Sequence, residues 1–148
     1  MKKYLLILMT LMFSVSSGYA FDKYSIDRAD LPAEARDFLE LHFPKSKIAM
    51  IKVDKHLLKK SDYDVKLVNG TKVEFNNSGK WTSVDCKRSA VPEKIVPDAI
   101  KRYVKKNCPD VKIVRIEKTA TQFEVELSDD VELTFNRLGQ FKSMKMKD

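Results

Sequence analysis

The sequence predicts an α+β fold in which two tandem helix-plus-four-strand units form one continuous antiparallel sheet, with the helices packed on one face. The main observation is an internal repeat. Residues 31–48 match residues 96–113 without gaps, and the match resumes where residues 63–67 and 74–81 pair with 123–127 and 134–141. Repeats of this length each form one unit of secondary structure and share a core. The second observation is that a helical apolar pattern precedes alternating apolar patterns in both copies.

The repeat also divides the chain into segments. Two lysines, an apolar run at 4–15 and small residues up to Ala20 are typical of a secretory signal peptide that is cleaved after Ala20. We therefore expect a signal peptide at 1–20, an N-terminal lead-in at 21–30, a first repeat at 31–86, a linker at 87–95 and a second repeat at 96–148. The apolar run is too short to be a convincing membrane span. The protein is thus predicted to be exported, to the periplasm or to the extracellular space, without stable membrane insertion.

Each copy begins with a predicted helix, at 33–42 and 98–107. Pro32 and Pro97 occupy the first turns, where the missing N–H of proline is tolerated, and Pro44 and Pro109 end the helices. One face of each helix is apolar or neutral, and the other is charged. The inner faces are predicted to contain Ala35, Phe38, Leu39 and His42 in the first helix, and Ile100, Tyr103, Val104 and Asn107 in the second.

Four strands are predicted after each helix. In both copies apolar residues alternate with polar ones, which is typical of a sheet with one buried and one solvated face. About eight strands should therefore form one sheet, and the helices should cover its apolar face. In the last strand of each copy, apolar residues alternate with polar ones at Val84 and Cys86 and at Met144 and Met146. We therefore expect these four residues to lie in the core.

The polar phase of the strands defines a candidate partner-binding surface, because no helix is expected to cover it. Its outward positions are Lys52, Asp64, Lys66, Glu74, Arg115, Glu124, Glu126 and Thr134. Strict alternation adds Trp81 and Phe141 to this face, where a repeated aromatic residue could anchor a partner. A β-bulge after the preceding turn would instead turn both rings into the core. The sequence leaves these alternatives open.

Cys86 and Cys108 are the only cysteines. Export permits a disulfide between them, which would join the two copies, but spacing alone cannot show that the residues approach closely enough. Two buried free thiols are the alternative. The formal charge falls from +7 to +5 when the signal peptide is removed, and lysine supplies most of the excess. Because acidic residues alternate along the same strands, we do not expect the protein to bind nucleic acid.

No catalytic residue, metal ligand set or cofactor motif emerges from the sequence. Two histidines and two cysteines are too few and too scattered for a zinc site, and no phosphate-binding loop or nucleophile elbow is present. Acid pairs such as Asp129 with Asp130, and Glu124 with Glu126, could act as general acid and base or as calcium ligands. Carboxylates on outward strand positions usually form a solvated face, however. We therefore predict that the protein is not an enzyme and requires no cofactor.

The arrangement resembles the exported PepSY-like family, whose fold is similar to that of the beta-lactamase inhibitor protein. The resemblance rests on the signal peptide, the two proline-bounded helices and the repeated strand pair, most specifically 63–67 with 72–81 and their counterparts 123–127 and 132–141. It implies one curved sheet whose concave face engages a partner. The disulfide within each unit of the inhibitor has no counterpart in this chain. Fold similarity does not transfer a target, so inhibition of a lactamase is not predicted.

These observations together predict a non-enzymatic exported binding module, inhibitor-like in its mode of contact. The expected partner is an unknown protein, peptide or envelope polymer that binds the open sheet face. A hydrolase or metal-dependent envelope enzyme is one alternative, and a carrier of a small apolar ligand between helices and sheet is another.

Overall fold

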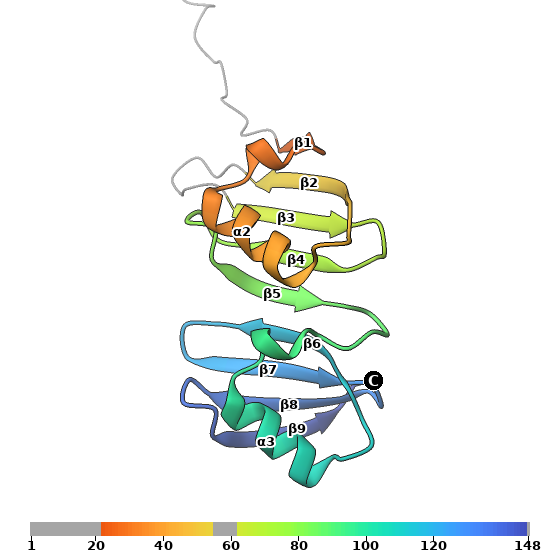
Figure 1. Cartoon of the computed structure of the whole chain (residues 1–148). Helices are drawn as coiled ribbons and strands as arrows, with labels where there is room; N and C mark the ends of the chain where they lie inside the picture. The colour runs from red at the N-terminus through yellow and green to blue at the C-terminus, as the bar shows by residue number, and fades with distance from the viewer. Residues whose placement is uncertain (1–21, 55–61, 148) are drawn as a thin grey trace, which may run out of the picture.

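A computed structural model describes residues 22–54 and 62–147, and it contains one antiparallel sheet of nine strands. The strands lie side by side in sequence order, from β1 at one edge to β9 at the other (Figure 1). Their bounds are β1 Lys23–Ser25, β2 Ile48–Asp54, β3 Asp62–Leu67, β4 Lys72–Phe75, β5 Trp81–Asp85, β6 Ile113–Lys118, β7 Gln122–Leu127, β8 Val131–Asn136 and β9 Phe141–Met146. The helices are α2 Ala33–His42 and α3 Asp98–Asn107, with short 3₁₀ turns at η1 Arg28–Asp30 and η2 Glu93–Ile95.

The predicted strand number of about eight is wrong by one. The additional strand, β1, comes from the N-terminal lead-in, which contains no repeat signal. It pairs with β2 in antiparallel register, with Ser25 opposite Ile51. The predicted signal peptide at 1–20 and the five extra residues of the first copy, around 55–61, lie outside the described residues.

Both helices lie on the same side of the sheet (Figure 1). Each begins directly after a proline, and each buries residues spaced four apart, Ala35 with Leu39 and Ile100 with Val104. This spacing places two side chains on one helix face, one above the other. The helices therefore cover the apolar face of the sheet, as the sequence pattern predicts.

A continuous row of buried residues crosses the sheet beneath the helices. Each residue is the cross-strand neighbour of the next, and none has measurable solvent exposure. The row consists of Ile51, Val65, Val73, Val84, Ile116, Val125 and Leu133. Burial of this apolar surface is the main stabilising contribution to the fold. The row passes from β5 to β6 without a break, so both halves share one core.

The expected core positions Met144 and Met146 are exposed instead, at 65% and 68%. Met144 lies opposite Leu133, on the helix side of the sheet, as its phase predicts. The strand is the outermost one, however, and side chains at its C-terminal half have no helix above them. The alternation of residues along the strand thus correctly predicts the side of the sheet on which Met144 lies. The prediction that Met144 is buried is wrong.

Two tight turns carry a glycine that contacts a helix. Gly79 and Gly139 have φ angles of +84° and +78°, which disfavour any residue with a side chain. A Cβ atom on Gly139 would lie 2.7 Å from the Cβ atom of Ala99, near the start of α3. Asn136 closes the same turn, because its Oδ1 atom accepts hydrogen bonds from the backbone N–H groups of Leu138 and Gln140.

A bulge after each of these turns decides the orientation of the two repeated aromatic residues. Glu74 lies opposite Ser83, but Phe75 lies opposite Trp81, so Thr82 is the additional residue. An equivalent shift places Phe141 opposite Phe135. Strict alternation, which puts both rings on the polar face, is therefore wrong. The side chain of Trp81 is half-buried on the helix side.

Trp81 packs between a helix and a lysine from the second half. Its ring centroid lies 6.3 Å from that of Phe38 in α2, and Lys118 Nζ lies 4.1 Å from the ring centroid. Burial, together with the positive charge of Arg137, lowers the pKa of Lys118. The corresponding Phe141 stacks on Tyr103 of α3, with centroids 4.7 Å apart, and stays 41% exposed.

Cys86 and Cys108 are both free thiols, so the disulfide that the sequence permits is not formed. Cys86 is buried after β5, and a hydrogen bond joins its thiol to Thr71 in the first half of the sheet. Cys108 lies just beyond the end of α3. Cys86 thus belongs to the core, whereas Cys108 is partly buried and packs against it.

The glycine turn at 139 gives a test of helix–turn packing. Gly139→Ala should lower the free energy of unfolding by about 1–3 kcal/mol, because it adds both an unfavourable φ and a clash with Ala99. Gly70→Ala is the matched control: Gly70 also has a positive φ, +92°, but open space where a Cβ would lie. Chemical denaturation should show a larger loss for Gly139→Ala. Equal losses would mean that contact with α3 contributes nothing.

The only tryptophan reports on the bulge. In the folded protein we expect blue-shifted emission that acrylamide quenches weakly. We also expect Trp81→Ala to lower the free energy of unfolding by about 3 kcal/mol. This value is near the lower end for a large-to-small core substitution, because the ring is half-buried. Acrylamide is neutral, so Lys118 does not attract it. Emission typical of a fully solvated indole would contradict the observed packing.

Candidate binding face of the sheet

The side of the sheet opposite the helices, here called the open face, is covered by no element among the described residues. Two rows of polar side chains cross it in direct cross-strand register. The first row is Lys52, Asp64, Glu74, Ser83, Glu117, Glu124, Thr134 and Ser143. The second row is Lys66, Lys72, Asp85, Arg115, Glu126, Glu132 and Lys145. Strand alternation holds these side chains on one side, because neighbouring residues point to opposite faces.

The eight outward strand positions predicted from the sequence all lie in these rows. Their role in binding stays a prediction. Trp81 and Phe141 do not join them, because the bulges turn both rings toward the helices. Sequence reasoning missed further members of the face, notably Lys72, Asp85 and Glu117. Alternation alone could have found each of them, but their position at the centre depends on the pairing of β5 with β6.

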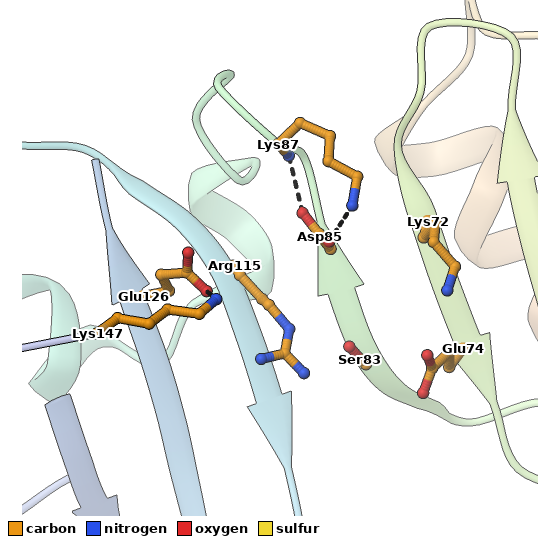
Figure 2. Close-up of a pocket in the computed structure, with 8 residues that line it drawn as sticks. All are labelled: Lys72, Glu74, Ser83, Asp85, Lys87, Arg115, Glu126 and Lys147. Atoms are coloured by element: carbon orange, nitrogen blue, oxygen red, sulfur yellow. Dashed lines mark hydrogen bonds and ion pairs between the residues drawn. The ribbon is translucent and has the colours of Figure 1, made fainter. Parts of the chain in front are cut away.

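A shallow hollow of about 310 Å³ lies at the centre of the open face and spans the β5–β6 junction. Charged side chains from both halves of the sheet line it (Figure 2). On its rim, Asp85 accepts hydrogen bonds from the backbone N–H and Nζ of Lys87, at 2.9 and 2.6 Å. Burial would raise the pKa of Asp85, but these hydrogen bonds outweigh it and hold the pKa below its ordinary value. The carboxylate of Asp85 therefore already has hydrogen-bond partners.

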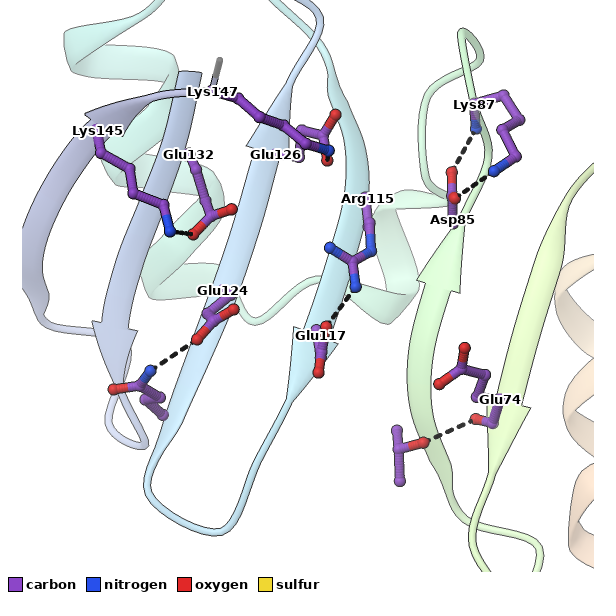
Figure 3. A network of polar contacts seen from close by, with 12 residues as sticks. Glu74, Asp85, Lys87, Arg115, Glu117, Glu124, Glu126, Glu132, Lys145 and Lys147 are labelled. Carbon is purple, nitrogen blue, oxygen red and sulfur yellow. Dashed lines mark hydrogen bonds and ion pairs between the residues drawn. The ribbon is translucent and has the colours of Figure 1, made fainter. Parts of the chain in front are cut away.

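The carboxylates of the second half of the face also have partners (Figure 3). Lys145 and Lys147 form ion pairs with Glu132 and Glu126, at 2.8 and 2.7 Å. Arg115 pairs with Glu117. Gln122 donates a hydrogen bond of 2.8 Å from Nε2 to Oε1 of Glu124. Glu124 and Glu126, the residues considered above for acid–base chemistry, are thus held by neighbouring side chains.

Two adjacent carboxylates in the first half differ from these. Asp64 and Glu74 are direct cross-strand neighbours, and within the described part of the chain neither carboxylate makes a hydrogen bond or an ion pair. Burial, followed by the charge of Asp54, raises the pKa of Asp64. Burial, followed by the charge of Asp64, raises the pKa of Glu74. Like charges in this register are destabilising.

These carboxylates line a second hollow of about 300 Å³ at the β3–β4 end of the face, together with Asp54 and Asp62. Lys52 is drawn to one side of it, where Nζ lies 2.7 Å from Asp54 and 3.3 Å from Asp22. Among the residues that the structure describes, no group of three or more His, Cys, Asp or Glu side chains is arranged to hold a metal ion. Four carboxylate side chains therefore line this end of the open face.

In the described ranges 22–54 and 62–147, neither helix has the length and apolar character needed to cross a membrane.

Comparison with protein families matches residues 61–143 to a family described as "Putative beta-lactamase-inhibitor-like, PepSY-like". No curated protein matches the chain.

Several solved structures are similar over most of the chain. A "putative periplasmic protein of unknown function" from Bacteroides vulgatus is 37% identical, with a TM-score of 0.81, and the match covers 84% of this chain and 99% of that one. A "putative calcium-regulated periplasmic protein" from Bacteroides thetaiotaomicron is 39% identical, with a TM-score of 0.79 and coverage of 84% and 96%. A second Bacteroides vulgatus protein, also described as "putative periplasmic", is 41% identical, with a TM-score of 0.79 and coverage of 86% and 99%.

The unpaired carboxylates predict an unusual pH dependence. If the pKa of a carboxyl is higher in the folded than in the unfolded protein, the protein becomes less stable as the pH rises through the folded pKa. Replacing both groups, as Asp64→Asn with Glu74→Gln, should therefore raise the free energy of unfolding at pH 7 by roughly 0.2–1 kcal/mol, the scale of a cross-strand charge pair.

The native carboxyls become protonated as the pH falls through their raised pKa values, so the gain should shrink there. It should reach zero below the ordinary values of 3.8 and 4.5, where the carboxyls are protonated in the folded and the unfolded protein alike. Thermal unfolding between pH 3.5 and 7.5 measures it. Glu40→Gln, on the exposed face of α2, is the matched control and should change little. A double variant that is less stable than the parent at pH 7 would show that the two carboxylates have a structural partner.

Proposed function

Because the chain belongs to the PepSY-like family, described as beta-lactamase-inhibitor-like, we propose that it is a non-enzymatic exported binding module that engages a polypeptide through the open face of its sheet. We also propose that its two helix-and-strand halves are tandem units of one kind, that residues 1–20 direct its export, and that it acts in the periplasm. The repeated turns, bulges and helix contacts support the tandem organisation. The periplasmic description of the similar structures supports the location.

One observation carries the binding proposal: the paired carboxylates of Asp64 and Glu74. Their register is unfavourable for folding, and neither makes an ion pair or hydrogen bond with a described side chain. The charge of Lys72 offsets the cost only in part, because the pKa of each carboxyl stays raised. Residues that reduce stability without a structural reason are typical of functional sites. A positively charged group bound between the two carboxylates would remove the repulsion and restore the hydrogen bonds that burial takes away.

The chemistry of the hollow favours arginine in the partner. A guanidinium group is planar and always charged, and its N–H groups can contact two carboxylates at once. Lysine offers a point charge without this geometry. The partner is therefore proposed to be a protein or peptide with an exposed arginine, and its remaining residues would contact the alternating charges of the central hollow. An anionic envelope polymer would meet repulsion at this end of the face.

A carrier function is the second candidate, because the helix side has an apolar groove. The groove has a volume of about 500 Å³, and its apolar lining includes Val91 of the linker, Val104 of α3 and Ile113 of β6. Such a volume is in the range of small-molecule sites. It is open to solvent and rimmed by charged residues, however, so it encloses an apolar ligand less completely than carriers do.

Binding of an arginine peptide tests the proposal directly. A fluorescein-labelled Gly-Arg-Gly-Arg-Gly peptide should bind the mature protein, and the Asp64→Asn, Glu74→Gln double variant should weaken binding at least tenfold in fluorescence polarisation. The Glu40→Gln control removes one carboxylate charge on the exposed face of α2, on the helix side of the sheet, and should bind normally. A peptide with lysine in place of arginine should bind more weakly than the arginine peptide.

The same assay separates the alternative functions. Equal affinity of the double variant would exclude this pair as the binding site. Displacement of the peptide by millimolar calcium, beyond that caused by sodium at matched ionic strength, would indicate a calcium site of the kind that one relative's description suggests. Turnover of a peptide or cell-wall substrate that Glu74→Gln abolishes would identify a hydrolase, because half-buried carboxyls with raised pKa values also suit general acid catalysis.

A further inference from the structure

The outermost strand β9 is exposed along its whole length. All six residues are exposed, although β9 pairs with β8 along its length, with one bulge near Phe141. The buried row that crosses the sheet ends here: Leu133 in β8 has no measurable exposure, whereas Met144, its neighbour in β9, is 65% exposed. Met146 and Phe141 extend this exposed apolar row along the strand. An apolar row that continues past the edge of its own core is typical of a surface that contacts another molecule.

The backbone of β9 is also available for pairing. Within the described part of the chain, β8 is its sole neighbour, so one side of its hydrogen-bonding ladder is open. The opposite edge of the sheet is different, because β1 is only three residues long. Proteins normally shorten, bend or charge an edge strand to prevent unwanted pairing. β1 follows this rule by its length. β9 carries two lysines, which charge this edge, but it is six residues long and also exposes Phe141, Met144 and Met146.

The side chains of β9 specify what could pair with it. Phe141, Met144 and Met146 lie on the helix side, and lysines lie on the open-face side. Lys145 and Lys147 keep 69% and 48% of their side chains exposed even while paired with Glu132 and Glu126. A strand added beside β9 would therefore place apolar residues next to the methionines and acidic residues next to the lysines. A second copy of this chain would instead bring its own lysines to the same side.

We infer that β9 is a docking edge for an extended segment of another polypeptide in which apolar residues alternate with aspartate or glutamate. The segment would add a tenth strand to the sheet. Its backbone hydrogen bonds would supply affinity, and the alternating side chains would supply specificity. This surface is separate from the Asp64 and Glu74 pair, which lies at β3 and β4, so one site can fail while the other holds.

A short peptide tests the inference. Fluorescein-labelled Thr-Val-Glu-Val-Glu-Val-Thr should bind the mature protein, and hydrogen exchange of residues 141–146 should slow when it is added. A version that carries lysine in place of glutamate should bind at least fivefold more weakly. A version methylated at every internal backbone nitrogen should not bind, because it cannot form the ladder. Equal binding of the methylated peptide would overturn the inference, since it would exclude strand addition.

Two charge-matched variants locate the site. Met144→Glu places an acid in the exposed apolar row and should weaken binding at least tenfold. Leu138→Glu makes the same change at a residue that is 77% exposed in the β8–β9 turn, outside the strand, and should weaken it less than twofold. Both positions are exposed, so circular dichroism should show unchanged folds.

Three further results would overturn the inference. The first is an equal effect of the two variants. The second is slowed exchange confined to β3 and β4. The third is a concentration-dependent dimer that Met144→Glu dissociates, which would identify a second copy as the occupant.

Discussion

The pairing of β5 with β6 is the contact on which the rest of the molecule depends. It joins Ser83 to Glu117, Val84 to Ile116 and Asp85 to Arg115. Val84 and Ile116 are fully buried, so this short ladder makes one core from the apolar faces of two four-stranded meanders. On the opposite side, Asp85 and Arg115 bring the polar rows of both halves into register, and the central hollow exists only because this junction aligns them. The same three residue pairs thus determine the core and the open face.

The open face distributes its charges unequally. Beyond the junction, lysine, arginine and glutamine side chains hold the glutamates, so the repulsion between neighbouring carboxylates is partly offset. At β3 and β4, Asp64 and Glu74 have no such ion pair among the described side chains. The more distant charges of Lys52 and Lys72 offset their repulsion only in part, and burial strengthens it. A protein selected for stability alone would place a lysine at one of these positions. The two ends of the open face therefore differ in charge, although the same alternation of polar and apolar residues builds both.

Sequence patterns predicted the layers of the fold and missed features that depend on three-dimensional neighbours. Alternation correctly assigned Lys52, Asp64 and Glu124 to the open face, because the phase of a strand is a local property. It could not assign Trp81 to a face. One additional residue in the bulge reverses the alternation, and the sequence pattern does not show whether that bulge forms. It also could not predict the exposure of Met144, because burial depends on whether a helix lies above the strand. The lack of a partner for Asp64 depends on side chains from several strands, and no local pattern contains that information.

The strictly sequential strand order has a consequence for how the chain folds. Most neighbouring strands are joined by short turns, so their pairing closes small loops and has a low entropic cost. Two pairings differ: β1 with β2, which spans α2, and β5 with β6, which spans the linker and α3. The entropy of loop closure is therefore concentrated at these two steps, while each set of hairpins can form from local contacts. The longest closure coincides with the junction that completes the core, so the halves gain their shared stability only when the last long loop has closed.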